Sequence, residues 1–152
     1  MRKAIFPGSF DPFTIGHADV VNRALHLFDH IVIAVGYNLQ KKSWISPEER
    51  VRVIKEYYKD EPKISVEKYC NLTTDFARQQ EAGFILRSIR SVKDYEYELN
   101  IADVNHKLSG IETILLLARP ELASISSSVV RELAQFGQDI TPFVPQGMKY
   151  IF

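Results

Sequence analysis

The chain has 152 residues, the size of one domain that can bury an ordinary hydrophobic core without a metal or a disulfide. Its 19 basic and 19 acidic residues cancel. This balance argues against a broad cationic surface, so we expect no nucleic-acid partner. The single cysteine, Cys70, excludes an internal disulfide and a cysteine-based zinc site, and it suits a reducing compartment.

The apolar segment at the N-terminus is short. Only Ala4–Phe6 separates the charged start of the chain from Pro7, which is too little for the apolar region of a signal peptide. No later apolar run is long enough to span a bilayer. We therefore expect a cytoplasmic protein with no membrane partner.

Short apolar runs alternate with longer helical patterns along the chain. The runs predicted to form strands are Ala4–Phe6, Ile31–Val35, Ile64–Glu67, Phe84–Leu86 and Thr113–Leu117. The predicted helices cover about 14–28, 47–59, 74–82 and 91–108, with a last one near 127–136. Nearly continuous apolar content predicts strands buried on both faces, as in a parallel sheet.

This alternation predicts an α/β fold, a Rossmann-like doubly wound sheet of five parallel strands with helices on both faces. No flexible linker, charge block or repeat divides the chain. Residues 1–152 are therefore expected to form one domain.

The first predicted strand leads through the turn Pro7–Pro12 into Thr14-Ile15-Gly16-His17, which opens a helix. A glycine and a histidine there place an imidazole beside unpaired backbone N–H groups at the positive end of the helix dipole, where a phosphate is stabilised. Packing is an alternative explanation: Gly16 would relieve crowding at the corner and His17 would pack ahead of Val20. Four residues alone do not decide between the two.

In open parallel sheets, ligands bind beyond the carboxyl ends of the strands. The predicted strands lead into five loops with polar or cationic residues: Ser9 and His17, Lys41 and Lys42, Thr73, Arg87 and Arg90, and Ser126–Ser128. Each group alone could be a solvated loop, a surface ion pair or a helix cap. Their joint position predicts an anion-binding site at one edge of the sheet.

The second helix has a clear start signal. Ser46 at the N-cap, Pro47 at the first helical position and Glu49 two residues later predict a capping box. Trp44, just before it, could be an aromatic lid over a cleft or a hydrophobic staple for the helix. The other histidines, His26, His30 and His106, are not spaced as ligands of one metal, so no protein metal site is predicted.

Two motifs carry a resemblance to a known family. The segment Phe6–Pro12 with Thr14-x-Gly16-His17, and Ile125–Ser128 with Arg131, resemble the two motifs of the nucleotidyltransferase superfamily. The segments between them are similar, in order and spacing, to those of the bacterial phosphopantetheine adenylyltransferases. They are Lys41-Lys42, Pro47–Arg50, Asp75–Arg78, Leu86–Arg90 and Asp94–Glu98. The similarity covers nearly the whole chain, and the intervening set is the more specific part.

The resemblance implies an enzyme that transfers the adenylyl group of ATP to 4′-phosphopantetheine and releases dephospho-coenzyme A and pyrophosphate. The attacking phosphate is already anionic, so positioning and charge stabilisation are expected to matter more than a general base. The implied catalytic residues are His17, as a donor to the α-phosphate, and Lys41, as a mobile cation. Mg²⁺ is expected to enter with ATP rather than on a dedicated protein site.

The resemblance also implies the binding residues. Those implied for ATP are Ser9, Phe10, His17, Ser88, Ile89, Arg90, Glu98, Leu122, Ala123, Ser124, Ile125, Ser126, Ser127 and Ser128. Those implied for phosphopantetheine are Ser9, Lys41, Thr73 and Arg87, with both arms of the Arg87 guanidinium on the phosphate. Three positions depart from the family pattern: Ser9 stands where threonine is frequent, Ser88 where glycine is common, and Leu122 where tryptophan is frequent.

The resemblance further implies feedback binding of coenzyme A in the same cleft and assembly into a homohexamer. The tyrosine-rich helix beginning near Ser91 could bury part of such an interface or belong to the core.

Two other functions remain open at this point. One is a different adenylyl- or cytidylyltransferase of the superfamily, acting for example on nicotinamide mononucleotide or glycerol phosphate. The match at Arg87–Arg90 and Tyr97-Glu98 argues against it. The other is a non-catalytic nucleotide-sensing domain, against which the presence of His17 and Lys41 argues.

Overall fold

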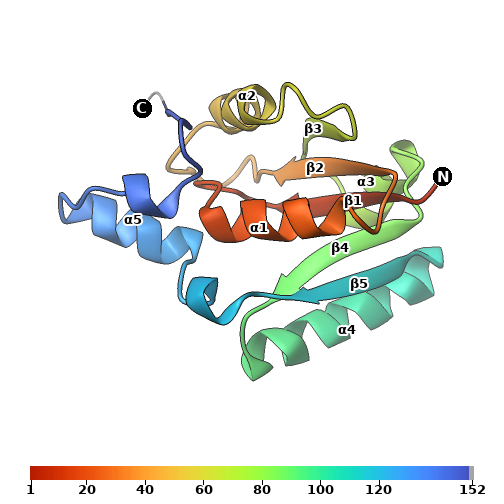
Figure 1. Ribbon diagram of the computed structural model, residues 1–152. Coiled ribbons are helices and arrows are strands. Elements are labelled where there is room, and N and C mark those ends of the chain that lie inside the picture. The colour runs from red at the N-terminus through yellow and green to blue at the C-terminus, as the bar shows by residue number, and fades with distance from the viewer. Residues whose placement is uncertain (151–152) are drawn as a thin grey trace.

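The computed structural model describes residues 1–150, so the last two residues of the expected domain lie outside the described part. It contains a five-stranded sheet in the order β3-β2-β1-β4-β5 (Figure 1), in which every neighbouring pair is parallel. The strands are β1 (Lys3–Gly8), β2 (His30–Gly36), β3 (Ile64–Tyr69), β4 (Phe84–Ile89) and β5 (Glu112–Leu117). The predicted fold class and the five predicted strands are confirmed.

The α-helices are α1 (Ile15–Ala24), α2 (Pro47–Tyr57), α3 (Thr73–Gln79), α4 (Val92–Ser109) and α5 (Ser127–Gln135). They match the predicted helices, with ends that differ by a few residues. The sequence explains where two of them start, because Thr14 and Ser46 accept backbone N–H groups of the first turn as N-caps. At α2, the Glu49 carboxylate forms a bidentate ion pair with Arg52.

The helices cover both faces of the sheet. Along β1, Ala4 and Phe6 join the core formed with α1 and α2, whereas Ile5 joins the core formed with α3. Figure 1 shows α1 and α3 on opposite sides of the sheet, and α4 packs against β4 and β5. The sheet is therefore doubly wound, as predicted.

Burial of the strands on both faces is confirmed for the centre of the sheet but wrong for its edges. All residues of β2 from Ile31 to Val35 are buried. On β3, in contrast, Glu67 and Lys68 are exposed, and Leu117 at the end of β5 is 67% exposed. Apolar content predicted two buried faces here, but an edge strand has a neighbour on one side only and incomplete helix cover.

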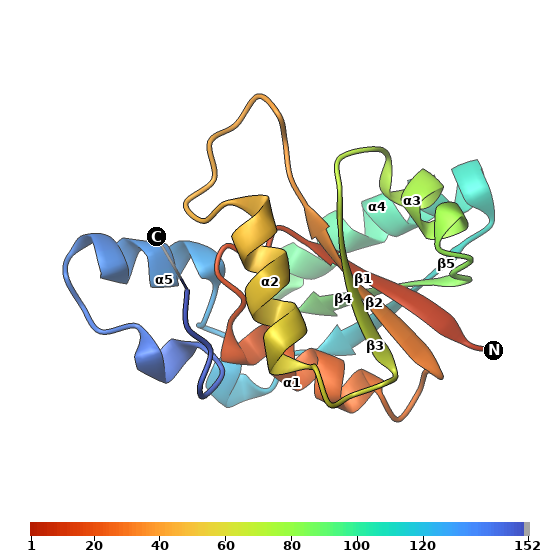
Figure 2. The same ribbon diagram turned by 90° about the horizontal axis from the view of Figure 1, so that it is seen from above.

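The chain reverses its direction of winding between β1 and β4, and this is where the site opens. Strand β1 pairs with β2 along its whole length, but with β4 only at Ala4 and Ile5. The carboxyl halves of β1 and β4 therefore separate at the switch point, where open parallel sheets bind ligands. Figure 2 shows that the connections after β2 and β3 both project beyond this edge.

Candidate active site

A cleft of about 1310 Å³ lies at the carboxyl edge of the sheet. Five of the predicted site residues line it: Ser9, Lys41, Thr73, Arg87 and Glu98. They come from five different elements or loops, so the tertiary fold brings together residues far apart in the sequence. This set includes all four residues implied for phosphopantetheine.

His17 lies in the first turn of α1 and is locked to Thr14. The Thr14 backbone N–H donates to His17 Nδ1 at 2.9 Å, and the His17 backbone N–H donates to Thr14 Oγ1 at 3.3 Å. Because Nδ1 accepts an N–H, it carries no proton, and the neutral ring holds its proton on Nε2. His17 thus offers one N–H donor.

The surroundings of His17 keep the ring neutral. The rings of Phe10 and Phe13 pack against it with centroid distances of 4.9 and 5.4 Å. Burial, together with the charges of Arg90 and Arg87, lowers the pKa of His17 from 6.5 to about 3. At neutral pH the side chain is therefore an uncharged hydrogen-bond donor.

The predicted serine motif is held against the turn before α1. Ser126 caps α5 by accepting the Val129 backbone N–H, and Ser127 Oγ donates to the Pro12 carbonyl at 2.7 Å. Arg131 donates from Nη1 to the Asp11 carbonyl at 2.7 Å. These bonds join the two motifs of the sequence. Arg131 lines the cleft, whereas Ser126–Ser128 lie outside its lining.

The start of α1 also faces the loop before the serine motif. A methyl group at Gly16 would lie 3.4 Å from Thr14 Oγ1 and 3.7 Å from the Ile125 carbonyl oxygen, both ordinary contact distances. The chain itself therefore has room for a side chain at Gly16. Relief of crowding, the packing explanation for this glycine, does not account for it.

Arg87 and Glu98, implied for different substrates, are partners of each other. Arg87 Nε and Nη2 donate to the Glu98 carboxylate at 2.9 and 2.6 Å, and Nη1 donates to the Pro7 carbonyl at 2.6 Å. Burial acts to lower the pKa of Arg87, but the bonds to Glu98 and its negative charge raise it. The guanidinium arms that we expected on a phosphate thus lie on a carboxylate that is only 5% exposed.

The other predicted residues lie around the cleft. Lys41 is exposed on the loop between β2 and α2, and Thr73 Oγ1 lies 3.0 Å from the Tyr69 hydroxyl at the start of α3. Ser88 and Ile89 end β4, and Arg90 bonds Asp94 through its backbone N–H and Nε. Trp44 lines the cleft and donates its backbone N–H to Asp11.

Two comparisons of sequence identify the family. The model of the cytidylyltransferase-like family matches residues 5–133. Phosphopantetheine adenylyltransferases of Phocaeicola vulgatus, Bacteroides fragilis and Flavobacterium johnsoniae are 60%, 57% and 52% identical to this chain over 149 residues. Each alignment covers 98% of this chain and 98% or 99% of the relative. This chain belongs to the phosphopantetheine adenylyltransferase family. The predicted resemblance, and with it the prediction of a nucleotidyltransferase, is confirmed.

Two charged residues of the cleft wall were not predicted from the sequence. They are Asp11 and Arg50, which are 6% and 1% exposed. Arg50 shares the inward face of α2 with the buried Val53 and Ile54. A charge at an apolar position of a helical pattern was the signal that could have identified it.

The part of the chain that the structure describes contains neither a metal-ligand cluster nor a membrane-spanning helix. Among residues 1–150, no three histidine, cysteine, aspartate or glutamate side chains gather as a metal site. Within the same range, none of the helices has the length and apolar content needed to cross a membrane.

Proposed function

We propose that this protein transfers the adenylyl group of ATP to 4′-phosphopantetheine and releases dephospho-coenzyme A and pyrophosphate. The observation that carries the proposal is one cleft that combines Ser9, Lys41, Thr73 and Arg87, with the neutral donor His17 at the adjoining helix start. The near full-length similarity to enzymes named for this reaction supports it.

The proposed adenylyl transfer needs hydrogen-bond donors and positive charge more than it needs a general base. An anionic oxygen of the phosphopantetheine phosphate attacks the α-phosphorus of ATP, a new P–O bond forms, and the bond to the pyrophosphate oxygen breaks. His17 donates its Nε2–H to the α-phosphate, and the Lys41 ammonium follows the charge as it moves. Both act where negative charge grows in the transition state.

We propose that the remaining ATP residues surround the nucleotide from the start of α1 to the start of α5. The helix N-terminus at Ser126–Ser128 offers backbone N–H groups to the β- and γ-phosphates. Glu98 supports this region through Arg87, because its carboxylate is nearly buried and bonds that guanidinium. Leu122–Ile125 and Ser88–Arg90 supply backbone contacts to the adenosine.

The His17 Nε2–H, the Lys41 ammonium and the backbone N–H groups at the start of α5 suit phosphate oxygens rather than a metal ion, so we propose that Mg²⁺ enters with ATP. When bound, Mg²⁺ would supply positive charge to the triphosphate, beside the donors that His17 and Lys41 provide. We propose a cytoplasmic location, which the exposed, free Cys70 suits. Coenzyme A, which shares the pantetheine and adenosine groups of the product, is proposed as a feedback ligand of the same cleft.

We further propose that the protein assembles into a hexamer through α4. Tyr97, Ile101, Val104 and Leu108 form an apolar stripe on this helix and are 40–63% exposed. Residues at this spacing share one side of a helix. Only Glu98 of α4 is buried, so the stripe offers apolar surface to a second copy.

A substrate panel tests the proposed reaction. Purified protein with ATP and Mg²⁺ is given 4′-phosphopantetheine, nicotinamide mononucleotide or glycerol phosphate, and pyrophosphate release is measured. We expect pyrophosphate release with 4′-phosphopantetheine and with neither of the other two acceptors. Release with nicotinamide mononucleotide only would identify another transferase, and ATP binding without release for any acceptor would identify a sensing domain.

A further inference from the structure

The site contains two buried charges that the proposed reaction does not use. Asp11 lies in the turn between β1 and α1, and Arg50 lies in the first turns of α2. Within residues 1–150, neither forms an ion pair with an opposite charge at 4 Å or less. A buried charge is costly unless hydrogen bonds compensate for lost water. The hydrogen-bond partners of Asp11 and Arg50 therefore indicate the role of each residue.

Arg50 binds three backbone carbonyls. Its Nε donates to the Ile45 carbonyl at 3.0 Å, and its Nη1 donates to the carbonyls of Gly36, at 3.2 Å, and Ser9. Gly36 is the last residue of β2, and Ile45 lies two residues before α2. One guanidinium thus holds both ends of the 37–45 loop, which carries Lys41, and joins them to the backbone of Ser9.

Asp11 holds the same loop from the other side. Its two carboxylate oxygens accept the backbone N–H groups of Trp44 and Ile45, each at 2.8 Å. Ile45 is therefore fixed through its N–H by Asp11 and through its carbonyl by Arg50. The tip of the loop, in contrast, is exposed to solvent: Leu39 is 83% exposed, and Lys41 is also exposed.

We propose that Asp11 and Arg50 form a brace that fixes the stem of the Lys41 loop against the Ser9 turn, and that both are positioning residues for phosphate transfer. The inference rests on the proposed function, because it assigns the brace to the reaction of that cleft. Stabilisation of a transition state depends on placement to within a fraction of an ångström. A loose stem lets the Lys41 ammonium spread over more positions, which weakens its action in the transition state more than substrate binding.

Two variants weaken the brace with little change in volume. Asp11→Asn replaces one acceptor oxygen with an NH₂ group that opposes a backbone N–H. Arg50→Lys keeps the charge, but a single ammonium cannot reproduce the fork that spans three carbonyls. Arg52→Lys is the matched control: it lies on the same helix, and its guanidinium binds Glu49 and the Lys149 carbonyl, outside the cleft lining.

Steady-state kinetics test the role through Lys41. We expect Asp11→Asn and Arg50→Lys each to lower kcat about 10- to 100-fold with little change in either KM, and Arg52→Lys to leave both unchanged. In a Lys41→Ala background, the same brace variants should lower kcat by less than about threefold, because the effects of residues that act through one another are not additive. Equal losses with and without Lys41 would overturn the brace, and a raised KM for 4′-phosphopantetheine at unchanged kcat would make Arg50 a substrate contact instead.

Limited proteolysis tests the brace without activity. Trypsin should cut folded Asp11→Asn and Arg50→Lys at Lys41-Lys42 at least several times faster than the parent or Arg52→Lys, with circular dichroism and Tm confirming that each is folded. Unchanged cleavage in both folded brace variants would overturn the proposal. A parent protein that does not use 4′-phosphopantetheine would overturn the proposed function, and proteolysis would still decide whether the brace exists.

Discussion

Thr14 sets the tautomer of the His17 ring at Nδ1, whereas the charge of the ring is set by the nearby rings of the same turn and by two arginines distant in sequence. The Thr14 backbone N–H fixes the tautomer, while the Phe10 and Phe13 rings and the Arg87 and Arg90 charges disfavour protonation. A neutral donor loses little to solvent reorganisation when a phosphate gains charge beside it. The same environment makes His17 unsuited to act as a cation at neutral pH.

Replacing His17 by alanine is expected to lower kcat by about 10² to 10³, the usual cost of one lost donor to a developing charge. ATP affinity should change much less, because the bond is worth most in the transition state. Steady-state kinetics and equilibrium ATP binding measure the two separately. An equal loss of affinity and of rate would make His17 a ground-state ligand.

The low pKa of His17 also predicts how stability depends on pH. The unfolded chain binds a proton at this histidine near pH 6.5, whereas the folded protein binds it only near pH 3. The unfolded state thus holds more protons between these values, so His17 destabilises the fold as pH falls from about 6.5. Tm of the parent should drop more than that of His17→Ala between pH 7 and 5, and the His17 ring signals in NMR should not titrate above pH 5. Titration of the ring near pH 6.5 would contradict this.

Among the elements, the start of α1 shows how a helix end can be shaped for a ligand. Thr14 caps this helix and fixes the His17 tautomer, and the Ile125 carbonyl faces Gly16. A methyl group at Gly16 would nevertheless make only ordinary contacts. The absent side chain therefore leaves open the approach to the backbone N–H groups of the first turn. This is the use that the phosphate hypothesis gives to Gly16.

Gly16→Ala is expected to leave Tm unchanged or slightly higher, because alanine favours a helix and the site has room for it. ATP affinity should fall about tenfold or more, since the methyl group stands where the phosphate approaches. Thermal unfolding and equilibrium ATP binding measure the two effects. A drop in Tm with unchanged affinity would return Gly16 to a packing role.

The elements themselves were readable from sequence for a local reason. N-caps such as Ser46 and apolar periodicity along α1 act between residues a few positions apart, so strands and helices were predicted with small errors at their ends. The edges of the sheet were not readable. β5 is as apolar as a central strand, and its exposure follows from its place in the sheet order.

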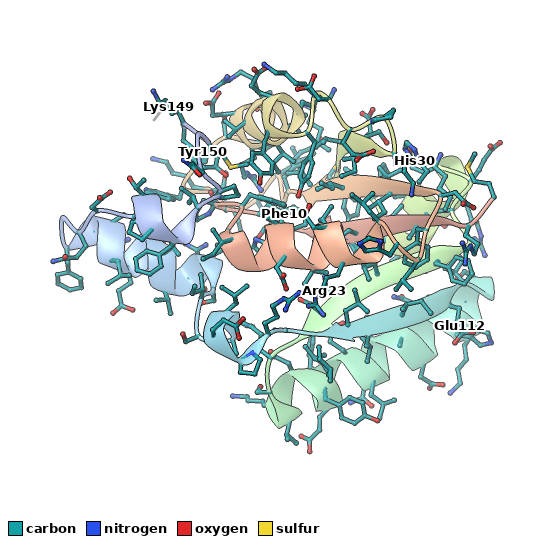
Figure 3. The ribbon with its side chains drawn as sticks, viewed as in Figure 1. Phe10, Arg23, His30, Glu112, Lys149 and Tyr150 are labelled. Atoms are coloured by element: carbon teal, nitrogen blue, oxygen red, sulfur yellow. The ribbon has the colours of Figure 1, made fainter. Side chains whose placement is uncertain are left out.

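For the whole molecule, the proposed assembly rests on apolar surface that a single chain leaves uncovered. Besides the stripe at Tyr97, Ile101, Val104 and Leu108, the same helix exposes Val92, Tyr95 and Leu99. Figure 3 shows Arg23 on α1 on the side toward β5, where it donates to the Leu117 carbonyl and secures that strand. The apolar residues of α4 named above, in contrast, are exposed in the single chain.

Val104→Lys is expected to lower the solution mass measured by light scattering, because it places a charge in the apolar stripe. Glu96→Gln, which makes the same change in net charge at another exposed position of α4, should leave the mass unchanged. A parent protein with the mass of one chain would contradict assembly through α4. An unchanged mass for Val104→Lys would place the interface elsewhere.

The sequence by itself determined the α/β alternation, the edge of the sheet where the loops gather, and the family, because caps, periodicity and motif spacing are properties of neighbouring residues. Only the tertiary structure decided the partners of the buried charges. Arg87 binds Glu98 while it lines the cleft, and Asp11 and Arg50 bind the loop at Ile45, which is 34 and 5 residues away from them in sequence. Coulombic and hydrogen-bond energies depend on distances and burial, which are fixed only when the sheet packs its segments together.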